Sequence, residues 1–198
     1  MVTIPGCVKV KDALIIRADG SGEVRIETET HAIRSEIVKF NAFRTNYYSE
    51  IMNYPPITRQ SAESLFSGDA FRVSTEVQEN HLTMVAQFDN INDLLKSRYA
   101  RLHSLIIEKN DERLTVRART GMQHLSYARD TSKAPFDKTA ISRLGAHLDE
   151  MALSFSVQLP NAVSATGGDG VGDGTTAAWS IVRKNYKTID ESISAFQT

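Results

Sequence analysis

The feature that most constrains this chain is the stretch from Thr75 to Asn110, where near-apolar positions recur at steps of three and four residues. Such steps place side chains along one side of an α-helix. The stripe consists of Val77, His81, Met84, Phe88, Ile91, Leu95, Tyr99, Leu102 and Leu105 or Ile106. One helix of this length would extend about 52 Å, whereas a compact chain of this size is only about 40 Å across. We therefore expect the helix either to break at residues 89–93 or to overhang and meet another chain.

Two other segments show the same helical spacing. Residues 31–54 end at two prolines, and residues 137–159 begin at Asp137, whose side chain suits an N-cap, and end at Pro160. The second segment spans fewer than three heptads, so packing within the chain and a coiled coil both remain open. Together with residues 75–110, these segments predict three long amphipathic helices.

Two regions show strand-like alternation instead. Residues 8–29 contain two β-rich runs separated by a glycine-containing turn at residues 18–22, which is typical of a β-hairpin. Residues 113–119 read RLTVRAR and alternate strictly, so that the three arginines share one face. The predicted fold class is therefore α+β and mainly helical. It comprises an N-terminal β-hairpin, three long amphipathic helices, one short basic strand and a C-terminal arm.

A change of composition divides the chain after residue 160. Residues 161–176 are rich in glycine, and such sequence forms a helix or a strand only at an entropic cost. We expect residues 1–160 to form a helical body and residues 161–198 to form a linker with a helical arm. The arm carries apolar side chains on short segments that need a docking surface: Trp179, Ile181, Tyr186, Ile189 and Phe196. Whether that surface belongs to this chain or to a neighbouring copy is left open.

Composition excludes several classes of protein. Apolar residues make up 41% of the chain and charged residues 24%, as in ordinary folded soluble proteins. The formal charge of −1 gives no overall attraction to nucleic acid or membranes, so such binding requires a local patch. Cys7 is the only cysteine, which rules out an internal disulfide. The aliphatic runs are short, so we expect no membrane span, no secretory signal and a cytoplasmic location.

One motif has the composition of a ligand-binding loop. It reads GDGTT and consists of Gly172, Asp173, Gly174, Thr175 and Thr176. It precedes a segment that we expect to be helical, and free N–H groups at a helix N-terminus can hold phosphate. The motif resembles the GDGTT nucleotide loop of chaperonins, which implies a metal-holding aspartate and a backbone lying against phosphate. The lysine of a Walker loop is absent, and a flexible linker with a threonine cap is the competing interpretation.

No group of residues predicts catalysis. His147 and Glu150 lie three apart on one expected helix, a spacing that can share a metal but also suits a simple surface contact. Cys7 has no nearby base in the sequence, and the G-x-S-x-G elbow of hydrolases is missing. We therefore predict no catalytic residue, no metal site and no cofactor.

Basic residues accumulate after residue 112. Arg113, Arg117 and Arg119 share a strand face, and Arg129 and Lys133 follow with few acidic residues between them. Because the guanidinium group suits phosphate, these residues are candidates for contact with single-stranded nucleic acid. In the competing interpretation, acidic residues at positions 108, 111 and 112 pair with the arginines, and the charges protect an edge strand.

These observations favour a non-enzymatic function. A dockable arm, an unpaired hairpin edge and an overlong helix together predict a self-associating structural or assembly subunit. A coat-type protein that packs along single-stranded nucleic acid fits this description, and its location would then be the virion. The expected partners are further copies of the chain and single-stranded nucleic acid, with no membrane. The alternative is a small nucleotide- or phosphate-binding regulatory protein that uses residues 172–176.

Overall fold

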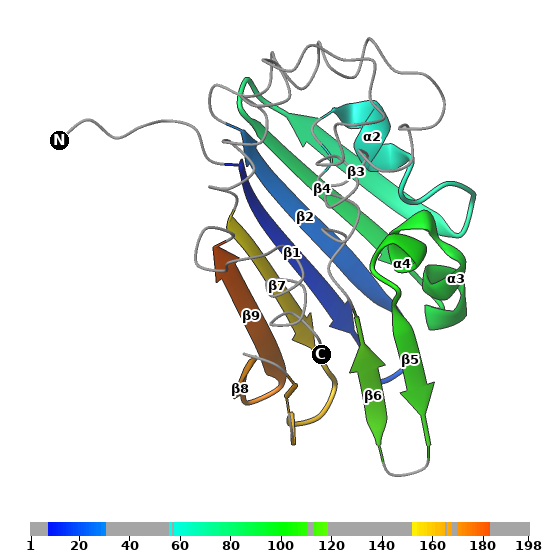
Figure 1. The fold of residues 1–198 in the computed structure, drawn as a ribbon. Coiled ribbons are helices and arrows are strands. Elements are labelled where there is room, and N and C mark those ends of the chain that lie inside the picture. The colour runs from blue at the N-terminus through cyan, green and yellow to red at the C-terminus, as the bar shows by residue number, and fades with distance from the viewer. Residues whose placement is uncertain are drawn as a thin grey trace, which may run out of the picture.

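The computed structural model describes residues 8–30, 56, 58–110, 113–118, 152–164, 166–167 and 170–182. Seven strands of this part form one mixed sheet in the order β3-β4-β2-β1-β7-β9-β8, and two more form the separate β5–β6 ribbon (Figure 1). The strands are β1 Val8–Ile16, β2 Gly22–Thr30, β3 Phe71–Val77, β4 His81–Phe88, β5 Ile106–Lys109, β6 Leu114–Arg117, β7 Ala152–Gln158, β8 Val171–Asp173 and β9 Thr176–Val182. The helices are α2 Arg59–Glu63, α3 Ile91–Lys96 and α4 Arg98–Leu102.

The prediction of a mainly helical fold is wrong. Strands predominate in the described residues, and their three helices have only five or six residues each. The stretch from Thr75 to Asn110 is not a helix but the end of β3, all of β4, the helices α3 and α4, and β5. Thr75 lies near the end of β3, and Gln78 lies in the turn between β3 and β4.

Steps of four residues explain the error, because side chains four residues apart share one face both on a helix and on a strand. Met84 and Phe88 are four apart and buried on β4, but Ala86 between them and Leu82 before them are buried as well. The same holds near Phe155, where residues 152–158 of the expected helix 137–159 form β7. Residues 137–151 and the helix expected over 31–54 lie outside the described residues.

The predicted N-terminal hairpin is present and central. β1 and β2 pair in antiparallel register from Val8 opposite Thr30 to Ile16 opposite Gly22. Neither strand has an open edge, since β2 also pairs with β4 and β1 pairs in parallel with β7. β8 and β9 also belong to this sheet, so residues 171–182 do not form part of a helical arm.

One face of the main sheet carries the hydrophobic core. Its side chains alternate along β1, β2, β4 and β7 and include Val10, Leu14, Ile16, Val24, Ile26, Leu82, Met84, Phe88, Leu153, Phe155 and Val157. The short helices lie toward the β3–β4 side of the sheet (Figure 1). They contribute the fully buried side chains of Ala62, Leu94 and Tyr99 to the core.

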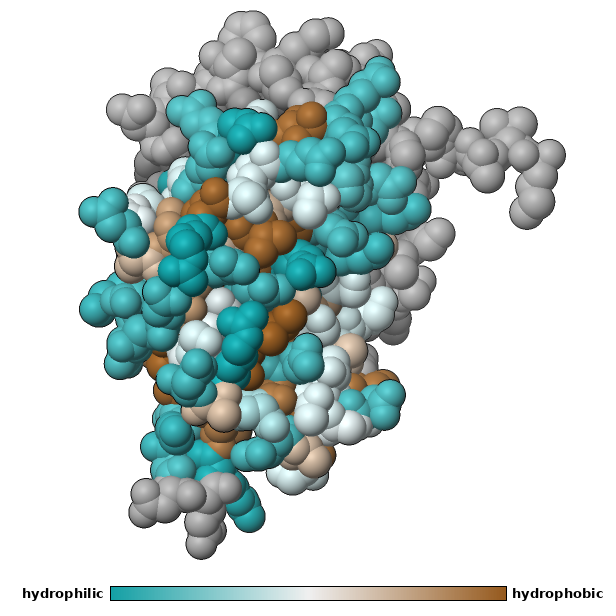
Figure 2. Space-filling view, turned by 180° about the vertical axis from the view of Figure 1, so that it is seen from behind, coloured by the Kyte–Doolittle hydropathy of each residue, from teal (hydrophilic) through white to brown (hydrophobic). Residues whose placement is uncertain are grey.

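The opposite face of the sheet is mostly hydrophilic, with small apolar areas between its polar side chains (Figure 2). Ion pairs cross from β1 to β2, with Lys9 Nζ 3.3 Å from Glu29 Oε2 and Lys11 Nζ 3.2 Å from Glu27 Oε2. These pairs are largely exposed, so each contributes little to stability. Among the described residues, no helix is long and apolar enough to span a membrane.

Candidate binding pocket

A pocket of about 450 Å³ lies between the β5–β6 ribbon and one end of the main sheet. Its lining comes from β6, the end of β7, the start of β9 and the loop at residues 159–167. The apolar part of the lining consists of Leu114, Val116, Val157, Leu159, Pro160, Ala162, Val163, Ala177 and Trp179. A volume of this size lies within the range of small-molecule sites in proteins.

The two charged residues of this lining are both arginines. Arg113 immediately precedes β6 and Arg117 ends it, and both are exposed, as the strand alternation predicts. Arg117 Nη2 lies 3.6 Å from Glu108 Oε2 across the ribbon, and both side chains are about 60% exposed. Solvent therefore weakens this pair, which leaves the guanidinium accessible to another anion. Three other predicted basic residues, Arg119, Arg129 and Lys133, lie outside the described residues.

Backbone hydrogen bonds attach the loop that forms the wall of the pocket to the turn between β8 and β9. Leu159 N–H donates to Thr175 O and Val163 N–H donates to Gly174 O, each at 2.8 Å. The Trp179 indole N–H donates to Gly167 O at 2.8 Å, which fixes the ring against the loop. Gly170 lies so close to this ring that a Cβ there would collide with the indole. The wall is thus formed before any ligand arrives.

The GDGTT motif supports this wall and does not begin a helix. Asp173 pairs with Thr176, so residues 174 and 175 form a two-residue turn between β8 and β9. Gly174 has a φ of +57°, a conformation that favours glycine. The geometry that suggested phosphate binding at a helix N-terminus is therefore not present at residues 172–176.

The residues predicted to form a docking arm are only partly described. Trp179 lies on β9 with a relative exposure of 4%, and the backbone of Ile181 pairs with Leu153 of β7. Tyr186, Ile189 and Phe196 lie outside the described residues. Trp179 therefore packs within its own chain, where it forms part of the core and of the pocket lining.

A buried polar cluster that was not predicted from the sequence lies on the core face of the sheet. The Tyr99 hydroxyl donates to Asp12 Oδ1 at 2.9 Å, and His103 Nε2 lies 3.3 Å from Asp12 Oδ2. All three residues are at most 2% exposed. A signal existed, because Asp12 occupies a core position between Val10 and Leu14 on β1.

Aromatic rings connect this cluster to the pocket. The rings of Tyr99 and His103 are 4.4 Å apart, and His103 is stacked on Phe155 at 6.0 Å. Phe155 in turn lies 6.0 Å from Trp179, which lines the pocket. The hydrogen bond from Tyr99 to Asp12 joins α4 to β1. Because Asp12 and His103 are buried by other described residues, the cluster is not accessible to a substrate at the surface of the described part of the chain.

A second cavity of about 620 Å³ lies on the side of the ribbon that faces the β1–β2 and β4–α3 turns. Its lining mixes cations such as Lys109 with the carboxylates of Asp19 and Asp89. Mixed charge gives this cavity no preference for an anion or a cation, in contrast to the first pocket. No group of three or more potential metal ligands occurs in the described part of the chain.

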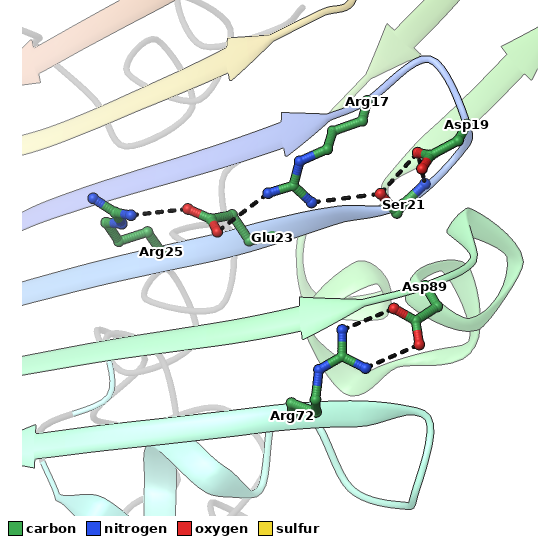
Figure 3. Close-up of polar contacts among 7 residues, drawn as sticks. All are labelled: Arg17, Asp19, Ser21, Glu23, Arg25, Arg72 and Asp89. Atoms are coloured by element: carbon green, nitrogen blue, oxygen red, sulfur yellow. Dashed lines mark hydrogen bonds and ion pairs between the residues drawn. The ribbon is translucent and has the colours of Figure 1, made fainter.

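Polar contacts order the turns next to this cavity (Figure 3). Hydrogen bonds from the side chain and backbone of Ser21 lower the pKa of Asp19. Two hydrogen bonds from the Arg72 guanidinium, at 2.8 and 2.9 Å, lower the pKa of Asp89. Glu23 lies between Arg25 at 2.8 Å and Arg17 at 3.6 Å. These carboxylates are thus engaged by hydrogen bonds and ion pairs within the chain.

Comparison with known proteins adds little to this description. No protein-family model and no curated protein matches the chain. One solved structure is similar in shape: the folded domain of the LppM protein of Mycobacterium tuberculosis, determined by NMR. The identity is 14%, the TM-score is 0.46, and the alignment covers 91% of this chain and 86% of that chain. Nothing about function follows from a similarity at this level.

Proposed function

We propose that this chain is a non-enzymatic binding protein that holds a small anionic amphiphile in the pocket between β6 and the β7–β9 end of the main sheet. The observation that carries the proposal is the lining itself. Its apolar wall includes Val157, Ala177 and Trp179, and its two charged residues are Arg113 and Arg117. A pocket whose walls are apolar and whose charged residues are all positive suits a ligand with an apolar tail and an anionic head.

The arrangement suggests how such a ligand is oriented. Arg113 and Arg117 are exposed, so an anionic head can be bound at the surface without being stripped of all its water. A guanidinium can donate two hydrogen bonds to one carboxylate or phosphate group. The tail would then extend along Leu114 and Val163 toward Trp179. Removal of that tail from water supplies the hydrophobic part of the affinity.

The single tryptophan makes the proposal testable without a label. Trp179 lines the pocket and is the only tryptophan in the chain, so its fluorescence reports directly on this site. Three ligands with the same twelve-carbon tail, dodecanoate, dodecanol and dodecyltrimethylammonium, are titrated below their micelle concentrations. We expect a saturable change of Trp179 emission with dodecanoate, a weaker response to dodecanol, and the weakest response to the cation.

Variants separate the pocket from the rest of the surface. Arg113→Gln and Arg117→Gln should each weaken dodecanoate binding about 10-fold, since a hydrogen bond to a charged group is typically worth about 1.5–3 kcal/mol. Arg25→Gln, on the far face of the sheet, is the matched control and should bind normally. The proposal fails if dodecanoate and the cation bind equally, or if all three variants bind alike.

Self-association and contact with single-stranded nucleic acid stay predictions. In support of the second, Arg117 lies on the exposed face of β6, and Arg113, which immediately precedes β6, is exposed as well. Each phosphate contact with a single strand releases about 0.7 counterions, so two arginines should give a log–log salt slope near −1.4. Binding of a labelled oligonucleotide that is unchanged in Arg113→Gln and Arg117→Gln would contradict this second candidate function.

A further inference from the structure

β3 forms one edge of the seven-stranded sheet. It is seven residues long and contains no proline, and it pairs with β4 in continuous register along its whole length (Figure 1). Edge strands in soluble proteins are usually short, interrupted by proline or a bulge, or covered, because an open edge is a template for another strand. β3 has neither a proline nor a bulge, and no described strand pairs with its outer side.

The hydrogen bonds of the β3–β4 turn show which backbone groups face this open edge. Gln78 and His81 exchange both of their backbone hydrogen bonds, at 2.8 and 3.4 Å. Hydrogen-bonded and non-hydrogen-bonded pairs alternate along an antiparallel ladder. Val73, Thr75 and Val77 therefore point their N–H and C=O groups away from β4. Phe71 also faces the edge, but its N–H donates to Gly68 O at 3.4 Å.

The side chains of β3 are complementary to a second copy of the same strand in antiparallel orientation. When Ser74 is opposite Ser74 of the second copy, Arg72 lies opposite the second copy's Glu76 and Glu76 lies opposite the second copy's Arg72. On the core face, Val73 is then opposite Thr75. A slide of two residues in either direction removes both charge pairs, because Arg72 or Glu76 then lies opposite Ser74, and a slide of four residues places Arg72 or Glu76 opposite itself. The charges thus select one register.

The backbone favours the same register. The pairs between odd-numbered residues, Val73 with Thr75, involve the groups that face the edge and can exchange hydrogen bonds in both directions. The pairs of Arg72 with Glu76 then fall at non-hydrogen-bonded positions, where opposing side chains are closest. The two-fold relation also keeps the core faces of both copies on the same side, which makes one continuous sheet.

We propose that β3 is a homodimer interface, and that two copies of this chain join through antiparallel β3–β3 pairing with Ser74 at the two-fold axis. The inference does not depend on the binding pocket, because β3 and β9 lie toward opposite edges of the main sheet. Arg72 already contacts Asp89 through both Nη atoms. A guanidinium has five N–H donors, so it can contact Asp89 and the second copy's Glu76 together.

Charge reversal tests the register directly. The chain mass is 22.0 kDa, and sedimentation of the full chain should show a concentration-dependent approach to twice that mass. Arg72→Glu and Glu76→Arg each place like charges at two symmetric positions, so each should raise the dimer dissociation constant at least about 10-fold. A mixture of these two variants should dimerise again, because both pairs are then of opposite sign. The doubly reversed chain should also dimerise.

Two further variants keep the test independent of folding. Asp89→Asn removes the internal contact of Arg72 and should leave the dimer intact. Thr75→Pro removes an N–H that faces the edge and takes no part in the β3–β4 ladder, so it should abolish the dimer while circular dichroism stays unchanged. A monomeric mass at every concentration overturns the proposal. So does dimerisation that persists in both single reversals, or a failure of the mixed variants to associate.

Discussion

At the scale of single residues, two polar side chains buried in the core differ in their hydrogen bonding. Asp12 receives the Tyr99 hydroxyl and lies beside His103, so its burial at 2% exposure is compensated. Thr28 is equally buried on β2, but its Oγ1 has no hydrogen-bond partner among the described residues. A buried polar group without a partner costs free energy, whereas one with a partner is close to neutral.

The difference predicts opposite effects for two conservative substitutions. Tyr99→Phe removes the donor to Asp12 and should lower the free energy of unfolding by about 1–3 kcal/mol. Thr28→Val removes a hydroxyl that has no partner and should leave the free energy unchanged or raise it by up to about 1 kcal/mol. Urea unfolding of both variants measures the two changes. If Thr28→Val destabilises as much as Tyr99→Phe, the cluster at Asp12 has no special role.

The ion pair of Arg72 and Asp89 predicts a pH effect. The pKa of Asp89 is lowered in the folded chain, so the pair stabilises the fold above the unfolded pKa of about 3.9. This contribution is lost as the pH falls through the folded pKa. In Arg72→Gln the pKa of Asp89 should rise toward its ordinary range, as followed by NMR of the carboxyl carbon. The pKa of Asp19, which depends on Ser21, should stay lowered; a parallel shift of both would point to a general effect.

At the scale of elements, local patterns located turns and hairpins but not the partners of long strands. The 8–29 hairpin and the alternation of residues 113–117 were predictable, because a turn and a period of two are local signals. β4 and β7 were read as helix, since their buried residues include pairs four apart, such as Met84 and Phe88. Their pairing with β2 and β1 links distant parts of the chain, and no local pattern shows it.

The same limit applied to the pocket. Arg113 and Arg117 were identified from their charge and from strand alternation. Val157 and Trp179 were assigned to a helix and to an arm, although they meet at the pocket through the β7–β9 pairing. One signal was available for this wall: residues 152–158 read ALSFSVQ, in which Leu153, Phe155 and Val157 alternate strictly with small or polar residues.

A glycine at the start of β2 sets how closely the central hairpin approaches β4. A Cβ at Gly22 would collide with Ile15 O and would lie 2.5 Å from Cζ of Phe88. Gly22→Ala should therefore lower the free energy of unfolding by about 1–3 kcal/mol or more, the usual cost of overpacking a core. At Gly172 a Cβ would lie 3.4 Å from Val163, an ordinary contact, so Gly172→Ala is the control. Thermal unfolding that ranks the two variants equally would contradict this account.

At the scale of the whole molecule, the described fold is one mixed sheet in which residues far apart in sequence lie side by side. β1 is paired with β7 in parallel, and β7 is followed in space by β9. The long aromatic side chains of Tyr99, Phe155 and Trp179 extend the core from α4 to β9. The segment 171–182 is therefore part of the packed sheet and core.

Truncation tests whether residues 166–198 are an appendage or part of the body. A chain that ends at residue 165 loses β8 and β9, so the open edge of β7 and the ring of Phe155 are exposed to water. Loss of one buried tryptophan side chain alone typically costs about 3–5 kcal/mol, a large share of the total stability of about 5–15 kcal/mol for a domain. We expect this chain to be unfolded or aggregated by circular dichroism and sedimentation.

A chain that ends after Val182 keeps every described strand and is the matched comparison, and it should retain far more of the native signal. A cooperative unfolding transition of normal midpoint in the shorter chain would instead show that β8 and β9 dock on a body that is stable without them. That result would favour an appended arm.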